Sequence, residues 1–123
     1  MKFIRNQFVA AVLLCLTLLF APPALAHARP KVMVPAADSS VPSPAMISVT
    51  FSEPVEGKFS SLNVTDEQGK KKFNTASSAA SPDDPKTLTL ALPPLQPGAY
   101  LVHWVSVAAD GHRMEGEYEF MVK

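Results

Sequence analysis

The sequence predicts an all-β domain, a sandwich or barrel of about seven strands. Apolar and polar residues alternate with a period of two in short runs such as 46–51, 61–65 and 87–92, which is typical of antiparallel strands with one wet face. Proline and glycine clusters separate these runs at intervals typical of a sandwich or barrel. The expected strands span residues 31–34, 45–51, 60–65, 70–74, 86–92, 99–107 and 116–122.

The first 26 residues have the layout of a secretory signal peptide. Lys2 and Arg5 form a positive start, residues 8–20 are almost wholly apolar, and Ala24-Leu25-Ala26 supplies a small-x-small cleavage site. The apolar run is shorter than the ~20 residues that span a bilayer. We therefore expect residues 1–26 to be cleaved and residues 27–123 to form one periplasmic domain.

The composition of residues 27–123 excludes several classes of function. These residues carry nine basic and eleven acidic side chains, so a basic nucleic-acid-binding surface is not expected. The one cysteine, Cys15, lies in the leader, which rules out a disulfide framework. A metal bound by the processed chain would need His, Met, carboxylate or backbone nitrogen ligands.

Two segments are expected to have little chemistry of their own. Residues 74–84 are rich in Ala, Ser, Pro and Asp, and we expect a mobile loop because few large apolar side chains are available to bury. Lys70-Lys71-Lys72 is expected to be a solvated hairpin edge that discourages edge-to-edge pairing.

Cleavage after Ala26 would make His27 the N-terminal residue. A free terminal amine and the Nδ1 atom of the same residue can close a chelate ring on a metal. Two nitrogens in that arrangement suit tetragonal Cu(II). A histidine that follows a cleavage site by coincidence is the alternative, and His27 alone does not exclude it.

Asp110-Gly111-His112 offers a possible complement to His27. The carboxylate and the imidazole are two residues apart and therefore lie on one side of an extended segment, while Gly111 permits a tight turn. An Asp-Gly hairpin turn beside an exposed histidine is the alternative reading of the same residues.

The remaining histidine and the methionines are weaker candidates. Alternation places His103 on the outer face of its strand, where a surface histidine is expected. The four methionines of residues 27–123 are scattered, and Met114 is the only one close enough in sequence to His112 to be considered as a thioether ligand.

The whole processed chain resembles the periplasmic copper-resistance proteins of the CopC family, including its YobA branch. The features that carry the resemblance are His27 after the leader, Pro35-Ala36, Phe51-Ser52-Glu53-Pro54-Val55, the run from Leu95 to Trp104, and Asp110-Gly111-His112 followed by Gly116, Tyr118, Phe120 and Lys123. Each motif alone is modest, but their order and spacing together are specific.

The resemblance implies a Greek-key β-sandwich, cupredoxin-like or immunoglobulin-like, that binds copper in the periplasm. It implies that the Cu(II) ligands are the amine and imidazole of His27, the Asp110 carboxylate and the His112 imidazole. Glu53 would orient the terminal residue as an outer partner. The resemblance also implies a carrier or buffer, expected as a monomer and not as an enzyme, that passes copper to a CopD-like inner-membrane partner.

Two departures from the family pattern matter. Some members have a methionine-rich Cu(I) site in mid-chain, whereas residues 64–82 contain no methionine. Because thioether ligands select Cu(I), we expect this chain to bind Cu(II) only. His103 stands where relatives commonly have Asp, and it is left out of the expected site.

Two other functions remain open on the sequence. An N-terminal histidine ligand resembles the histidine brace of copper-dependent polysaccharide monooxygenases, although the chain is short for such an enzyme. A metal-free sandwich module for adhesion or assembly is also possible, because fold alone does not imply function.

Overall fold

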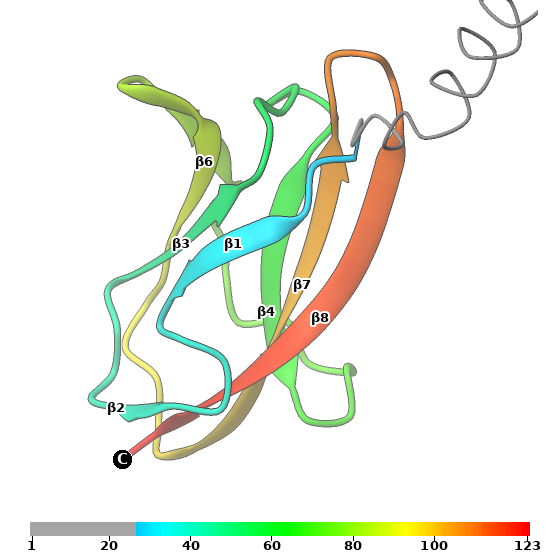
Figure 1. Ribbon diagram of the computed structural model, residues 1–123. Helices are drawn as coiled ribbons and strands as arrows, with labels where there is room; N and C mark the ends of the chain where they lie inside the picture. Colours follow the sequence, from blue (N-terminus) through cyan, green and yellow to red (C-terminus); the bar gives the residue numbers. More distant parts are fainter. Residues whose placement is uncertain (1–26) are drawn as a thin grey trace, which may run out of the picture.

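The computed structural model describes residues 27–123 (Figure 1). The expected signal peptide, residues 1–26, lies outside the described residues, so its cleavage stays a prediction. The described chain forms eight strands: β1 (Pro30–Val34), β2 (Ser40–Val41), β3 (Met46–Phe51), β4 (Ser61–Asp66), β5 (Ala79–Ser81), β6 (Asp84–Ala91), β7 (Gly98–Val107) and β8 (Arg113–Val122). The expectation of an all-β fold is confirmed.

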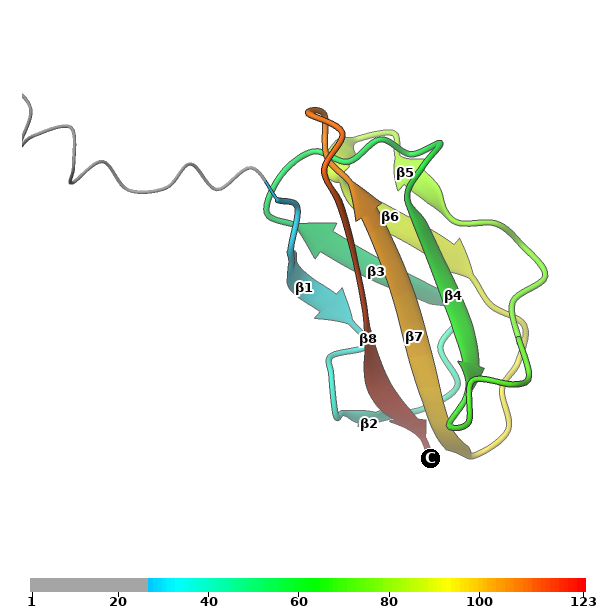
Figure 2. The ribbon, with the colours of Figure 1, turned by 90° about the vertical axis from the view of Figure 1, so that its right-hand side faces the viewer.

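The strands form two four-stranded sheets that pack face to face (Figure 2). One sheet has the order β1-β3-β6-β5 and the other β2-β8-β7-β4. Every pairing is antiparallel except the short parallel contact of β2 with β8. The chain passes repeatedly from one sheet to the other, and these crossings bring sequence-distant loops together at each end of the sandwich.

The core lies between the sheets and follows from the alternation in the sequence. Phe51, Val64, Leu88, Val102 and Phe120 come from five different strands, and each is at most 1% exposed. Burial of such side chains contributes about 1.5–3 kcal/mol each to folding. With no cysteine among residues 27–123, this apolar layer is what holds the two sheets together.

The structure corrects the expected strand list in three places. Residues 70–74 form no strand beyond an isolated bridge between Thr65 and Lys72, because the Asp66 carboxylate accepts the Lys70 N–H at 2.8 Å and fixes a turn. The expected mobile loop 74–84 contains β5, which pairs with β6. The third correction is β2, which the expected list lacks. With two residues, it is too short to show any alternation in the sequence.

Two side chains occupy part of the outer edge of β4, and backbone hydrogen bonds to Lys71 and Phe73 occupy the rest of its length. The Leu62 N–H donates to Ser78 Oγ at 2.9 Å, and the Val64 N–H donates to Asn74 Oδ1 at 2.9 Å. Asn74 is only 4% exposed, although it lies in the segment that composition marks as a loop. The segment that follows β4 is therefore fastened along that strand.

None of residues 27–123 forms a helix of the length and apolarity that a membrane crossing needs.

Candidate metal centre

The segment that precedes β1 is anchored to the sandwich by two serines. Ser106 Oγ donates to the Ala28 carbonyl oxygen at 2.7 Å, and both residues are fully buried. Ser52 Oγ accepts the Arg29 N–H at 3.0 Å and donates to the His27 carbonyl oxygen at 3.2 Å. These bonds fix the backbone of His27 while its side chain stays exposed.

The β7–β8 loop brings Asp110 and His112 into direct contact. Gly111, at φ 85°, provides the left-handed residue between them. The Asp110 carboxylate accepts the His112 backbone N–H at 3.0 Å through Oδ1 and bonds His112 Nδ1 at 2.7 Å through Oδ2. The Asp-Gly-His triplet is thus a fixed loop in which carboxylate and imidazole face each other.

The structure brings His27 and His112 together across 85 positions of sequence. Their ring centroids are 4.9 Å apart in an edge-to-face arrangement. Figures 1 and 2 show the start of the described chain and the β7–β8 loop at the same end of the sandwich. His112 therefore contacts both the Asp110 carboxylate of its own loop and the His27 ring at the start of the described chain.

The environment of Asp110 favours its charged form. The backbone N–H of His112 holds the pKa of the Asp110 carboxyl below its usual range, and the His112 side chain adds to that shift. The His112 side chain is 58% exposed and that of Asp110 is 39% exposed. A cation can therefore reach both groups from solvent, and the carboxylate is available to bind it at neutral pH.

The donors fit a divalent copper ion in type, but they do not form a preassembled cage. Within residues 27–123, no cluster of three or more His, Cys, Asp or Glu side chains has the geometry of a metal site. Two imidazoles and a carboxylate are nitrogen and oxygen donors of the kind that Cu(II) accepts. In the described chain the His112 ring lies against both the His27 ring and the Asp110 carboxylate. The backbone nitrogen of His27 would be the remaining donor.

Glu53 lies next to the Ser52 anchor and is partly exposed. Within the described residues it takes part in no ion pair. Its expected role as an outer partner of the terminal residue stays a prediction.

His103 lies apart from this end of the molecule, in the middle of β7. Its Nε2 bonds Thr65 Oγ1 at 2.8 Å and its Nδ1 bonds Glu117 Oε2 at 3.2 Å. Both ring nitrogens are thus held by neighbouring strands. Met114 lies on β8 opposite the buried Ser106 of β7 and is itself partly buried.

Sequence reasoning missed the two serines that position His27. Ser52 is part of the Phe51-Ser52-Glu53 motif, in which only the charged Glu53 was considered as a candidate. Ser106 was detectable as a polar residue on the inward face of β7, where alternation predicts an apolar side chain. A buried hydroxyl requires a partner, and the Ala28 carbonyl is that partner.

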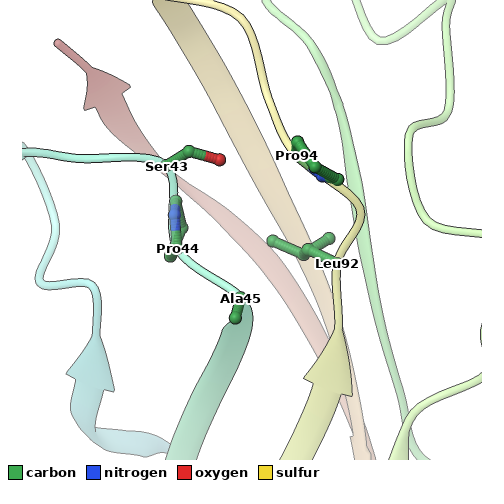
Figure 3. Close-up of a pocket in the computed structure, with 5 residues that line it drawn as sticks. All are labelled: Ser43, Pro44, Ala45, Leu92 and Pro94. Carbon is green, nitrogen blue, oxygen red and sulfur yellow. The ribbon is translucent and has the colours of Figure 1, made fainter.

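A separate shallow pocket lies near β2 and the β6–β7 connection. Ser43, Pro44, Ala45, Leu92 and Pro94 line it (Figure 3). Ser43 Oγ accepts the Leu95 N–H at 2.8 Å, which ties two loops together there. No histidine or carboxylate is among these lining residues, so the pocket is unrelated to the metal candidates.

Comparison with known sequences and protein families gives a consistent result. A family model described as the CopC domain matches residues 31–123. "Copper resistance protein C" of Escherichia coli is 38% identical over 107 residues, covering 81% of this chain and 84% of that protein. "Protein YobA" of Escherichia coli strain K12 is 36% identical over 115 residues and is covered to 92%, as is this chain.

Solved structures give the same result. The crystal structure of CopC from Methylosinus trichosporium OB3b superposes with a TM-score of 0.73 at 34% identity, covering 79% of this chain and 94% of that one. PcoC, a methionine-rich copper resistance protein from Escherichia coli, gives a TM-score of 0.71 at 36% identity, covering 80% and 100% of the two chains. With the family model and relatives above 30% identity agreeing over most of its length, the chain belongs to the CopC family.

Proposed function

We propose that this protein binds Cu(II) in the periplasm and acts as a copper carrier or buffer in copper resistance or homeostasis. The observation that carries the proposal is the meeting of His27 with the Asp110–His112 pair, with ring centroids 4.9 Å apart. Two of its relatives, Copper resistance protein C and PcoC, are described as copper resistance proteins.

The proposed ligands are the amine and imidazole of His27, the Asp110 carboxylate and the His112 imidazole. Removal of residues 1–26 supplies the amine, because the His27 nitrogen is otherwise an amide. In the copper-free chain Asp110 Oδ2 and His112 Nδ1 share a hydrogen. That proton must leave before both atoms bind one ion, so copper uptake releases protons.

The donor chemistry supports Cu(II) over Cu(I). The four methionines of residues 27–123 are Met33, Met46, Met114 and Met121. They lie on three different strands, so thioether ligands that would select Cu(I) are not gathered. PcoC is described as methionine-rich, and this chain differs from it in that respect.

Periplasmic location rests on the leader. Its basic start, apolar run and Ala24-Leu25-Ala26 ending match an exported protein. The same cleavage that releases the domain also creates the chelating terminus, so export and site formation are one event.

Transfer of copper to a CopD-like inner-membrane protein requires a docking surface near the ligands. The exposed side chain of Phe59 is the proposed anchor of that surface. Its side chain is 69% exposed on a turn held by Phe59 N–H and Ser60 N–H bonds to the Glu56 carbonyl, both 3.0 Å. Glu56 N–H in turn donates to the Val107 carbonyl at 2.8 Å, directly before the β7–β8 loop. A rigid exposed aromatic residue is a typical interface anchor.

Electron paramagnetic resonance of the processed protein with one equivalent of Cu(II) tests the site. We expect a tetragonal spectrum with nitrogen couplings that are lost in His27→Ala and in His112→Ala, while His103→Ala keeps the parental spectrum. A form with one methionine before His27 should lose the chelate. Equally tight Cu(II) binding by that extended form would overturn the ligand assignment.

A transfer assay tests the hand-off separately. Copper-loaded protein is mixed with the CopD-like membrane protein of the same organism in nanodiscs, and the rate of copper transfer is measured. We expect Phe59→Ser to slow transfer severalfold with unchanged Cu(II) affinity. Val32→Ser, at a second exposed apolar position (55% exposed), is the matched control. Equal rates for both variants and the parent would exclude Phe59 as the anchor.

A further inference from the structure

A polar pocket of about 330 Å³ lies along the outer edge of β4. Lys58, Ser60, Asn63, Lys72 and Ser78 contribute to its lining. Among its described lining residues there is no Asp or Glu. The pocket is therefore positive and rich in hydrogen-bonding groups.

Three side-chain acceptor atoms of this lining are already engaged within the protein. Ser60 Oγ accepts the Val107 N–H at 2.9 Å, and Ser78 Oγ accepts the Leu62 N–H at 2.9 Å. Each hydroxyl keeps its own proton to donate. Asn63 Oδ1 likewise accepts from Asn74 Nδ2 at 3.3 Å, which leaves the amide hydrogens of Asn63 as donors. The neutral groups of the pocket thus have donors to offer.

The two lysines supply matching charge. Ion pairs within residues 27–123 involve His103, His112 and Arg113, so neither Lys58 nor Lys72 is neutralised by a carboxylate in the described chain. Lys58 precedes β4 and the backbone of Lys72 bridges to Thr65 on that strand, and both lysines are among the lining residues of the pocket. Two cations beside hydroxyl and amide donors are complementary to a doubly charged oxyanion.

We propose that this pocket is a binding site for a small oxyanion of charge about −2, a phosphate or a dicarboxylate. It is independent of the copper site and of the copper function. Inorganic phosphate and succinate are the two probes, because the first offers a tetrahedral oxyanion and the second offers planar carboxylates.

The test is a nitrogen-15 NMR titration of copper-free residues 27–123 at pH 7.5. Each anion is added at constant ionic strength set with sodium chloride. We expect saturable shifts confined to the amides of Lys58, Asn63, Lys72 and Ser78, with a dissociation constant in the millimolar range. The probe that saturates at lower concentration identifies the preferred oxyanion.

Lysine variants separate a site from general charge attraction. Lys58→Gln and Lys72→Gln should each weaken binding about tenfold, since each removes one charged hydrogen-bond donor. Lys70→Gln is the matched control, because Lys70 belongs to the same basic run but is not part of the lining.

Shifts that do not saturate with either anion would overturn the proposal. So would an effect of Lys70→Gln equal to that of Lys72→Gln, because the anions would then respond only to net charge. Neither result would bear on copper binding, which the spectroscopic test above measures on its own.

Discussion

Ser106 on β7 donates a hydrogen bond to the carbonyl oxygen of Ala28 at 2.7 Å, across 78 positions of sequence and with neither residue exposed. This contact fixes the residue that follows His27. The position of the candidate metal ligand is therefore set from the interior of the sandwich as well as from the surface.

Ser106→Ala should loosen this attachment. The Ala28 carbonyl would stay buried without a partner, at a cost of about 1–3 kcal/mol in the free energy of unfolding. Because His27 is then held less firmly, Cu(II) affinity should also fall. Urea unfolding and a copper competition titration measure the two effects. Ser48→Ala, at a partly exposed position of β3, should change neither.

Asp110 should remain ionised well into the acid range in copper-free protein. The His112 backbone N–H and then its side chain lower the pKa of the Asp110 carboxyl. A carboxyl whose folded pKa is lowered stabilises the fold above the ordinary Asp value of about 3.9, and that contribution is lost as pH falls through the lower folded value. NMR of the Asp110 carboxyl carbon should place its titration below the ordinary value, and the accompanying shift of the His112 amide should vanish in Asp110→Asn. Titration at or above 3.9 would contradict the loop geometry.

Copper affinity should depend on pH in a different range. Imidazoles and a terminal amine must lose protons before they bind a metal. Affinity should therefore fall as pH drops below the reference amine pKa of about 8, and more steeply below the reference histidine pKa of about 6.5. Competition titrations between pH 5 and 8 check this. A Cu(II) affinity that stays unchanged across that interval would be incompatible with a site built from His27 and His112.

Gly116→Ala should destabilise the protein. A Cβ atom at position 116 would lie 2.6 Å from the Trp104 indole, which itself packs edge-on against Phe51 with ring centroids 5.8 Å apart. Displacing an indole from such a layer costs about 1–3 kcal/mol. Urea unfolding followed by the fluorescence of Trp104, the single tryptophan, measures the loss. Glu115→Ala, on the same strand, is the control: its free energy of unfolding should lie within about 0.5 kcal/mol of that of the parent.

Tyr118→Phe should not destabilise the protein. The Tyr118 hydroxyl is buried, and no hydrogen-bond partner for it exists among residues 27–123, so its removal relieves a desolvation cost of about 1 kcal/mol.

Burial also raises the pKa of Tyr118 far above its ordinary value. A phenol whose folded pKa is raised stabilises the fold below about pH 10 and loses that contribution as pH rises. The parent should therefore lose stability above pH 10 more steeply than Tyr118→Phe. A lower melting temperature for the variant at neutral pH would reveal a partner for the hydroxyl.

Most of the strands that were predicted correctly from the sequence have enough residues to show alternation. β3, β6, β7 and β8 have six to ten residues each, and their period-two pattern is visible. β2 has two residues and β5 has three, and they form because neighbouring strands offer edges. Pairing of that kind depends on tertiary contact, which a local pattern does not encode.

The candidate ligands could be predicted for a different reason. His27 and the Asp110-Gly111-His112 triplet are chemically distinctive, and their spacing matched a family. What the sequence could not reveal was how His27 is held. Ser52 and Ser106 are ordinary serines locally, and their partners are the His27 and Ala28 carbonyls at distant positions.

The side chains fastened along the outer edge of β4 have a consequence for behaviour at high concentration. Ser78 and Asn74 occupy the N–H groups of Leu62 and Val64, which an uncovered sheet edge would present to a neighbouring molecule. A second chain therefore finds few open N–H groups on that side to pair with, so edge-to-edge aggregation through β4 is disfavoured.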